Sequence, residues 1–153
     1  MQDYMKKSLI FRSFNRINAP TARVWGALTT PGLMKKFMFG AEVISDWKVG
    51  SPLIWRLAGT EKMLKGTIIA IEPGKRLSYT IIDPDAGYPD IPENYTRVTY
   101  ELTEDHGETI VSVSDGDFAA VADGEKRYQR TIGGWDLALK NLKEVVEGME
   151  SGL

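Results

Sequence analysis

The sequence contains no cysteine and a single histidine, His106. Thiol catalysis, cysteine-rich zinc sites and iron–sulfur clusters are therefore excluded, and one histidine gives little basis for a metal site. His106 lies in the stretch Glu-Asp-His-Gly, which is typical of a turn between two strands. A catalytic base would need a nucleophile within hydrogen-bond reach in a sheltered site. We therefore expect no cofactor, no metal ligand and no catalytic residue.

Long apolar runs and an excess of charge of one sign are also missing. The apolar run nearest the N-terminus is Leu9-Ile10-Phe11, whereas a signal peptide needs about 7–15 apolar residues and a spanning helix about 20. The net charge is −2, which provides no electrostatic footprint for nucleic acid. The sequence therefore predicts a cytoplasmic protein with no membrane insertion and no nucleic-acid partner.

The remaining composition is that of an ordinary globular chain. Of the 153 residues, 42% are hydrophobic and 26% are charged. A chain of this length commonly forms one domain and can bury enough surface to fold without disulfides or metals. We see no repeat or linker, so we expect a single domain over residues 1–153.

Two short helices are predicted to follow an N-terminal strand. Residues 8–17 are rich in β-forming side chains and end at Asn18-Ala19-Pro20. Proline suits the first turn of a helix, and Thr30-Pro31 repeats the same start signal eleven residues after Pro20. Helices this short cannot bury much surface alone, so they must pack against something larger.

Residues 40–115 show regularly spaced turn signals, a pattern typical of an antiparallel meander. Turn signals at 48–51, 58–60, 72–75 and 104–107 separate segments rich in Val, Ile, Thr, Tyr and Trp. In 96–102 the alternation places Val98, Tyr100 and Leu102 on one face and Arg97 on the other. Arg97 is then either a solvent-side charge or, after a register shift, an inward partner for a ligand carboxylate. About six strands plus the N-terminal one are expected, and such a sheet must be covered on one face.

The cover is predicted at the C-terminal end, where Asp123 can cap a helix of about 25 residues. An apolar stripe with steps of four and three residues follows it: Tyr128, Ile132, Trp135, Leu139, Leu142, Val146 and Met149.

Two segments break local rules. Gly133-Gly134 lies inside the predicted helix, either for close packing on the sheet or to thin the helix beside a ligand or allow a bend. Residues 83–94 contain three prolines and four acidic residues. This stretch is either a solvated connector or a lid or docking segment at a cavity mouth.

Five motifs in order resemble those of a known superfamily. They are RINAPTARVWGALTTP (16–31), VISDWKVGSPLIWR (43–56), KGTIIAIEPGKRLSYT (65–80), VTYEL (98–102) and GWDLALKNLK (134–143). Together they resemble the START-like, or Bet v 1-like, superfamily, in the branch named after the activator of the heat-shock-protein-90 ATPase. The resemblance implies an α+β helix-grip fold, in which a curved antiparallel sheet wraps around the long C-terminal helix and encloses a hydrophobic cavity.

The resemblance leaves three functions open. The first is binding of a hydrophobic or amphipathic small molecule between the sheet and the helix. The second is a chaperone-accessory role, although the namesake activator resembles this chain only in its C-terminal domain. The third is a cyclase- or hydratase-type activity, which would need an inward acid, base or tyrosine with a shifted pKa.

Aromatic side chains are the main candidates for the cavity wall, because an apolar wall with a few polar tips is what small-molecule pockets use. For several of them, simple core packing is an equally good interpretation. The candidate ligand-binding residues are Phe37, Phe39, Trp55, Tyr79, Tyr100, Trp135 and Leu139.

Overall fold

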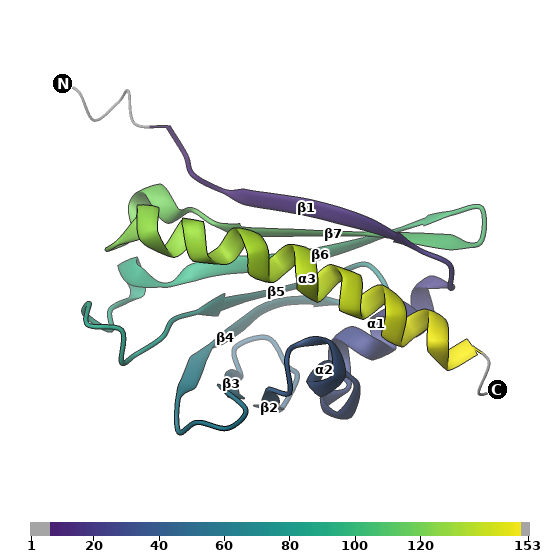
Figure 1. Cartoon of the computed structure of the whole chain (residues 1–153), viewed down its shortest axis with the longest axis horizontal. Coiled ribbons are helices and arrows are strands. Elements are labelled where there is room, and N and C mark those ends of the chain that lie inside the picture. The colour runs from purple at the N-terminus through teal and green to yellow at the C-terminus, as the bar shows by residue number, and fades with distance from the viewer. Residues whose placement is uncertain (1–6, 151–153) are drawn as a thin grey trace.

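The protein is a curved sheet that lies around one long helix, seen in a computed structural model that describes residues 7–150 (Figure 1). The helices are α1 (Thr21–Thr29), α2 (Pro31–Phe37) and α3 (Gly124–Glu150), with 3-10 turns η2 (Pro92–Asn94) and η3 (Phe118–Ala120). The strands are β1 (Phe11–Ile17), β2 (Glu42–Ser45), β3 (Pro52–Arg56), β4 (Met63–Glu72), β5 (Arg76–Ile81), β6 (Thr96–Asp105) and β7 (Glu108–Gly116).

All seven strands belong to one sheet with the order β1-β7-β6-β5-β4-β3-β2, and each neighbouring pair is antiparallel. The N-terminal strand β1 thus pairs with β7, the last strand of the chain. The sheet edges are β1 on one side and β2 on the other. The α+β helix-grip fold predicted from the sequence is confirmed.

The predicted helix starts are also confirmed. Pro20 precedes α1 in an extended conformation, and Pro31 occupies the first turn of α2 after Thr30. Pro31 has no N–H to lose in the first turn and its fixed φ is already helical, whereas Pro20 stands one residue earlier, at the N-cap of α1.

Alternation along the strands decides which side chains meet the helix. In β6, Thr96, Val98, Tyr100 and Leu102 are buried, whereas Arg97 is exposed. Arg97 is therefore the solvent-side charge, and the alternative of an inward partner for a ligand is wrong. The core lies between the inner face of the sheet, α3 and the plug formed by α1 and α2.

The helix α3 has 27 residues and so extends about 40 Å across the concave face of the sheet (Figure 1). Its second half is the better packed part, because Ala138, Leu139, Leu142 and Val146 are all buried. Tyr128 and Ile132 in the first half are only half-buried. The sheet and the helix therefore pack tightly at the end covered by α1 and α2 and less tightly at the other end.

The glycine pair of α3 has no packing reason. A Cβ built at Gly133 or Gly134 would meet no atom within 4 Å, and both residues are exposed. The close-packing interpretation is wrong at these positions. Close approach occurs instead at Gly66 in β4, where a Cβ would lie 1.6 Å from the Thr80 carbonyl oxygen.

Candidate ligand-binding pocket

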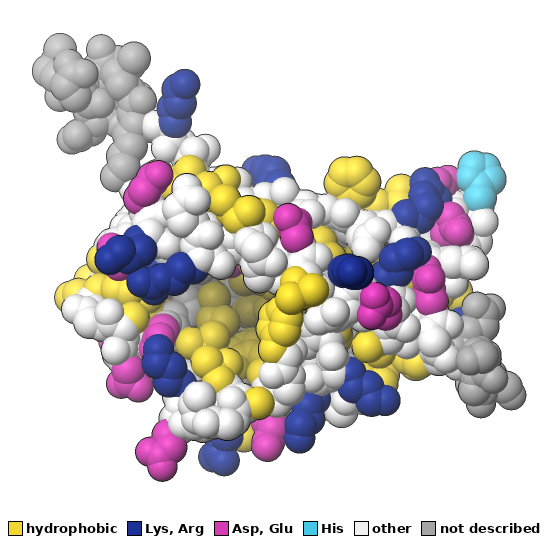
Figure 2. Space-filling view, in the orientation of Figure 1, with side chains coloured by type: hydrophobic (Ala, Val, Ile, Leu, Met, Phe, Trp, Pro, Cys, Tyr) yellow, Lys and Arg dark blue, Asp and Glu magenta, His cyan; other side chains and the backbone are white. Residues whose placement is uncertain are grey.

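An apolar pocket of about 500 Å³ opens at the less tightly packed end of the core. Figure 2 shows it as a hollow lined with hydrophobic side chains below α3. Its walls come from the segment after α2, from the inner faces of β3 to β7, and from α3. The lining residues are Met38, Phe39, Ala41, Trp55, Leu57, Ala58, Thr60, Leu64, Tyr79, Ile81, Val98, Asp115 and Trp135.

The register of the sheet brings the deep wall together. Tyr79 pairs with Val98 between β5 and β6, and Val98 pairs with Asp115 between β6 and β7. Directly paired residues point to the same face of a sheet, so these three side chains form one row on the concave side. Trp55 of β3 joins the row because its ring centroid lies 6.1 Å from that of Tyr79.

One carboxyl group stands in this apolar wall. Asp115 is 6% exposed, and its Oδ2 accepts a hydrogen bond from Trp135 Nε1 at 3.0 Å. Its Oδ1 is buried without a hydrogen-bond partner. Burial raises the pKa of Asp115, although hydrogen bonding from the Trp135 and Thr96 side chains and the charge of Arg127 act in the opposite direction.

The other polar groups of the deep wall are aromatic. The indole Nε1 of Trp55 is buried and has no hydrogen-bond partner, in contrast to that of Trp135. Burial raises the pKa of Tyr79 well above its usual value, and the nearby Tyr100 and Asp115 raise it further. The Tyr79 hydroxyl therefore stays protonated and can take part in hydrogen bonds at any ordinary pH.

Phe39 stands at the mouth of the pocket. It is 53% exposed and has a φ of 58°, a left-handed conformation that non-glycine residues seldom adopt. Gly40 follows it with a φ of 81°, so the chain turns sharply between α2 and β2. On its other side, Phe39 borders a groove of about 170 Å³ that Gly134 and Thr131 of α3 also line. The missing side chain of Gly134 thus leaves open space beside Phe39, in agreement with the thinned-helix interpretation of the glycine pair.

The seven candidate residues fall into two groups. Phe39, Trp55, Tyr79 and Trp135 line the pocket. Phe37, Tyr100 and Leu139 are buried in the core and do not line it. Tyr100 supports the wall from behind, since its ring packs edge-on against Trp135 with centroids 5.7 Å apart.

Asp115 was not among the sequence candidates, although a signal for it exists. Val111 and Val113 are buried on the concave face of β7, and the same period of two reaches Asp115. A carboxyl group at an inward position near a strand end was therefore readable from the pattern.

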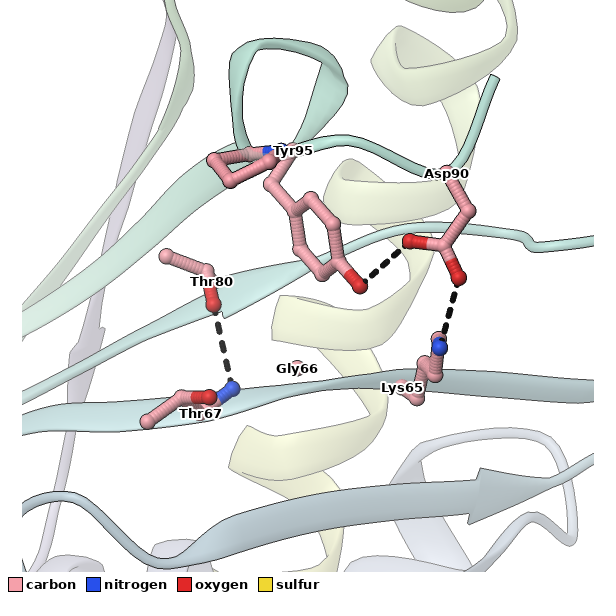
Figure 3. Close-up of a pocket in the computed structure, with 7 residues that line it drawn as sticks. Lys65, Gly66, Thr67, Thr80, Asp90 and Tyr95 are labelled. Carbon is pink, nitrogen blue, oxygen red and sulfur yellow. Dashed lines mark hydrogen bonds and ion pairs between the residues drawn. The ribbon is translucent and has the colours of Figure 1, made fainter. Parts of the chain in front are cut away.

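A second hollow, of about 470 Å³, lies beside the close approach of β4 and β5 at Gly66 and Thr80, and polar contacts of Asp90 lie at its rim. Figure 3 shows Lys65 and Tyr95 converging on Asp90, at 2.6 Å and 2.7 Å, with α3 behind the strands. These contacts lower the pKa of Asp90, chiefly through the hydrogen bond from Lys65. Since Asp90 belongs to the segment 83–94, the hollow is best explained as the anchor of that segment.

Further contacts fix the same segment at the start of α3. Arg127 lies 4.4 Å from the ring centroid of Tyr88, and Asn94 Oδ1 accepts a hydrogen bond from the Ala122 N–H at 2.9 Å. None of residues 83–94 lines the apolar pocket. The connector interpretation of this segment therefore fits better than a lid.

Within 7–150, no group of three or more His, Cys, Asp or Glu could hold a metal ion. No helix in that range is long and apolar enough to cross a membrane. His106 is exposed in the β6–β7 turn, where its Nδ1 lies 2.7 Å from Asp105.

The fold and the pocket define a START-like helix-grip domain. Residues 18–147 match the family of activator of Hsp90 ATPase homolog 1-like proteins. This match spans most of the chain, so the protein belongs to that family.

Comparison with solved structures gives the same fold. A protein from Cytophaga hutchinsonii, solved in solution, is 35% identical, with 94% of this chain and 97% of that chain covered and a TM-score of 0.75. A crystal structure of a Mesorhizobium loti protein is 23% identical, with 90% and 96% covered and a TM-score of 0.76. The solution structure of the Aha1 dimer from Colwellia psychrerythraea is 19% identical, with 91% and 96% covered and a TM-score of 0.70. No curated protein matches the chain significantly.

Proposed function

We propose that the protein binds a hydrophobic or amphipathic small molecule in the apolar pocket between the sheet and α3. The observation that carries this proposal is a concave, largely apolar wall around about 500 Å³, within the range of small-molecule sites. Burial of apolar ligand surface stabilises a complex by about 25 cal/mol per Å² before association costs are subtracted.

Each candidate residue has a place in this proposal. Trp55, Tyr79 and Trp135 would contact the ligand as fixed aromatic walls, and Phe39 would contact it at the mouth. A second set, Phe37, Tyr100 and Leu139, would hold those walls in position from the core. Substitutions in the first group should therefore change ligand affinity directly. Substitutions in the second group should change affinity only together with the free energy of unfolding.

Native mass spectrometry of freshly purified protein tests the proposal, followed by denaturation and identification of any released molecule. A pocket-filling variant supplies the matched control: Val98→Phe adds a ring at a pocket-lining position, and Val49→Phe adds the same ring at a 65% exposed position. We expect the copurified molecule to be lost from Val98→Phe and retained by Val49→Phe. Retention by both variants, with both folded, would contradict the proposal.

A chaperone-accessory role is a second candidate, favoured only by the description of the family. It predicts a contiguous exposed apolar patch. The exposed large hydrophobic residues instead lie on separate elements, among them Phe14 on β1, Ile44 on β2, Ile91 before η2 and Leu137 on α3. Stimulation of an Hsp90 ATPase by the full chain, equal for wild type and Val98→Phe, would favour this role over ligand binding.

A further inference from the structure

We propose that the pocket selects a largely apolar ligand that presents a hydrogen-bond donor, a hydroxyl or an ammonium group, to Asp115 and a hydrogen-bond acceptor to Trp55. The inference rests on the proposed binding function and names the chemical class of its ligand. It also predicts that an anionic head group is rejected from the deep end of the pocket.

The first argument is the isolation of Asp115. It is the only charged residue among those that line the pocket, and its neighbours in the row are Val98 and Tyr79. Trp135 donates to Oδ2, and the Thr96 side chain lies close enough to lower the pKa of the carboxyl, but Oδ1 is buried without a well-formed hydrogen bond of its own. A buried acceptor without a donor costs free energy, and a ligand donor in the adjacent pocket would remove that cost.

The basic group whose charge acts on this carboxyl makes its own contacts elsewhere. Arg127 influences Asp115 through its charge, but its guanidinium donates to the Ala122 carbonyl at 3.2 Å and lies over the Tyr88 ring. No ion pair within 4.0 Å joins Arg127 to Asp115. Among the described residues, the carboxyl therefore keeps an unused acceptor at the pocket wall.

The second argument is the unpaired donor of Trp55. Its Nε1 is buried without an acceptor, although Trp55 is 3% exposed and packed against Tyr79. An indole N–H can only donate, so a matching ligand must carry an oxygen or another acceptor at this point. Two unsatisfied groups of opposite type on one apolar wall fit a ligand with two polar substituents better than a plain hydrocarbon.

In its ionised form, Asp115 also predicts which head groups the pocket excludes. A carboxylate or phosphate placed against it would find like charge and no basic side chain among the lining residues. Ligands of the fatty-acid type would then bind only with the head group at the mouth, whereas an alcohol or amine could enter polar end first.

A matched probe series tests the inference: methylnaphthalene, naphthalenemethanol, naphthylmethylamine and naphthoic acid, titrated into the full chain by calorimetry. The naphthalene ring is common to all four probes, so differences in Kd report the polar group. We expect the Kd values of the alcohol and the amine to be at least about tenfold lower than that of methylnaphthalene. Naphthoic acid should have the highest Kd of the four probes.

Two variants assign the preference to Asp115. In Asp115→Leu the advantage of the alcohol and amine over methylnaphthalene should disappear. In Asp115→Asn, which keeps the shape and an acceptor, the amine should lose most of its advantage and the alcohol should stay within about threefold of wild type. Trp55→Phe should weaken the alcohol without changing methylnaphthalene. Near-ultraviolet circular dichroism verifies the fold, and if Asp115→Leu does not fold, Asp115→Asn decides alone.

The outcomes separate the two proposals. Equal Kd values for all four probes in wild type, or an alcohol preference that survives in folded Asp115→Leu, would overturn the selectivity and leave pocket binding in place. Absence of binding by every probe would overturn both proposals. Tight binding of naphthoic acid alone would overturn the selectivity and indicate a pocket for anions.

Discussion

The hydrogen bond between Trp135 and Asp115 is the best place to test the physical reasoning about the pocket wall. It joins α3 to the end of β7 at 3.0 Å, and both residues are buried. Trp135→Phe removes the indole donor and leaves the buried Asp115 carboxyl without this hydrogen bond. Hydrogen bonds to charged groups contribute about 1.5–3 kcal/mol, so we expect a loss of about 2 kcal/mol in the free energy of unfolding at neutral pH.

The loss should appear in thermal and denaturant unfolding followed by circular dichroism. For a domain of this size, 1 kcal/mol corresponds to roughly 2–4 °C in Tm, so Trp135→Phe should unfold about 4–8 °C below wild type. Asp115→Leu leaves the indole N–H unpaired and should also destabilise. The double variant removes both partners and should be more stable than the two single losses added together, which makes the coupling energy positive by about 1.5–3 kcal/mol.

The coupling should depend on pH in a defined direction. Burial raises the folded-state pKa of Asp115 above the ordinary value of 3.8, so the folded state favours the protonated acid. Stability from this group is therefore fully present below pH 3.8 and is lost as the pH rises through the raised folded pKa. Asp115→Leu should lack that loss, and the coupling with Trp135 should shrink as the pH falls and the carboxyl is neutralised.

A coupling below about 0.5 kcal/mol at neutral pH would refute this reasoning, because distant sites are additive only to that level. It would mean that the Trp135–Asp115 contact contributes no more than packing. An increase of the coupling on acidification would contradict the assigned direction of the Asp115 titration.

Three further predictions follow from the other contacts. Gly66→Ala should destabilise by about 1–3 kcal/mol, since its Cβ would meet backbone at 1.6 Å, while Gly133→Ala should stabilise by up to about 1 kcal/mol in thermal unfolding. Asp90→Asn should release the segment 83–94 from Lys65, and limited proteolysis should then cut this segment faster than in wild type. In wild type, the same release should occur when the pH falls through the lowered pKa of Asp90, below 3.8. Leu142→Ala, at a fully buried position of α3, should cost about 2–5 kcal/mol by denaturant unfolding, and a cost under 1 kcal/mol would contradict the assigned core.

The fold was predictable because its signals are local. Pro20 and Pro31 set the two helix starts by their own φ and missing N–H, and the turn signals act within four residues. The stripe of α3 has a period that only a helix satisfies, and it supplied the one element long enough to cover the sheet. These features need no information about distant parts of the chain.

The site was only partly predictable because it depends on register between strands. Trp55, Tyr79 and Trp135 were candidates for the cavity wall, but whether each borders a void or packed neighbours is set by elements far apart in sequence. Phe37 and Phe39 are two residues apart, but Phe37 is buried and Phe39 is exposed. Phe37 lies on the buried side of α2, whereas Phe39 follows the helix in a left-handed turn. Propensity alone does not distinguish these two environments.

The position of the pocket follows from how the two ends of α3 are supported. At the C-terminal end, α1 and α2 fill the space under the helix, and Leu142 and Val146 are fully buried there. At the N-terminal end, the helix is held by contacts with η3 and with the segment 83–94, such as Tyr128 with Phe118 and Arg127 with Tyr88. The pocket lies between these two ends, where Asp115 and Trp55 each keep an unpaired polar atom although Trp135 of α3 bonds the other oxygen of Asp115. Buried polar atoms are normally paired, so these two atoms mark this end of the grip as the place to test the proposed ligand binding.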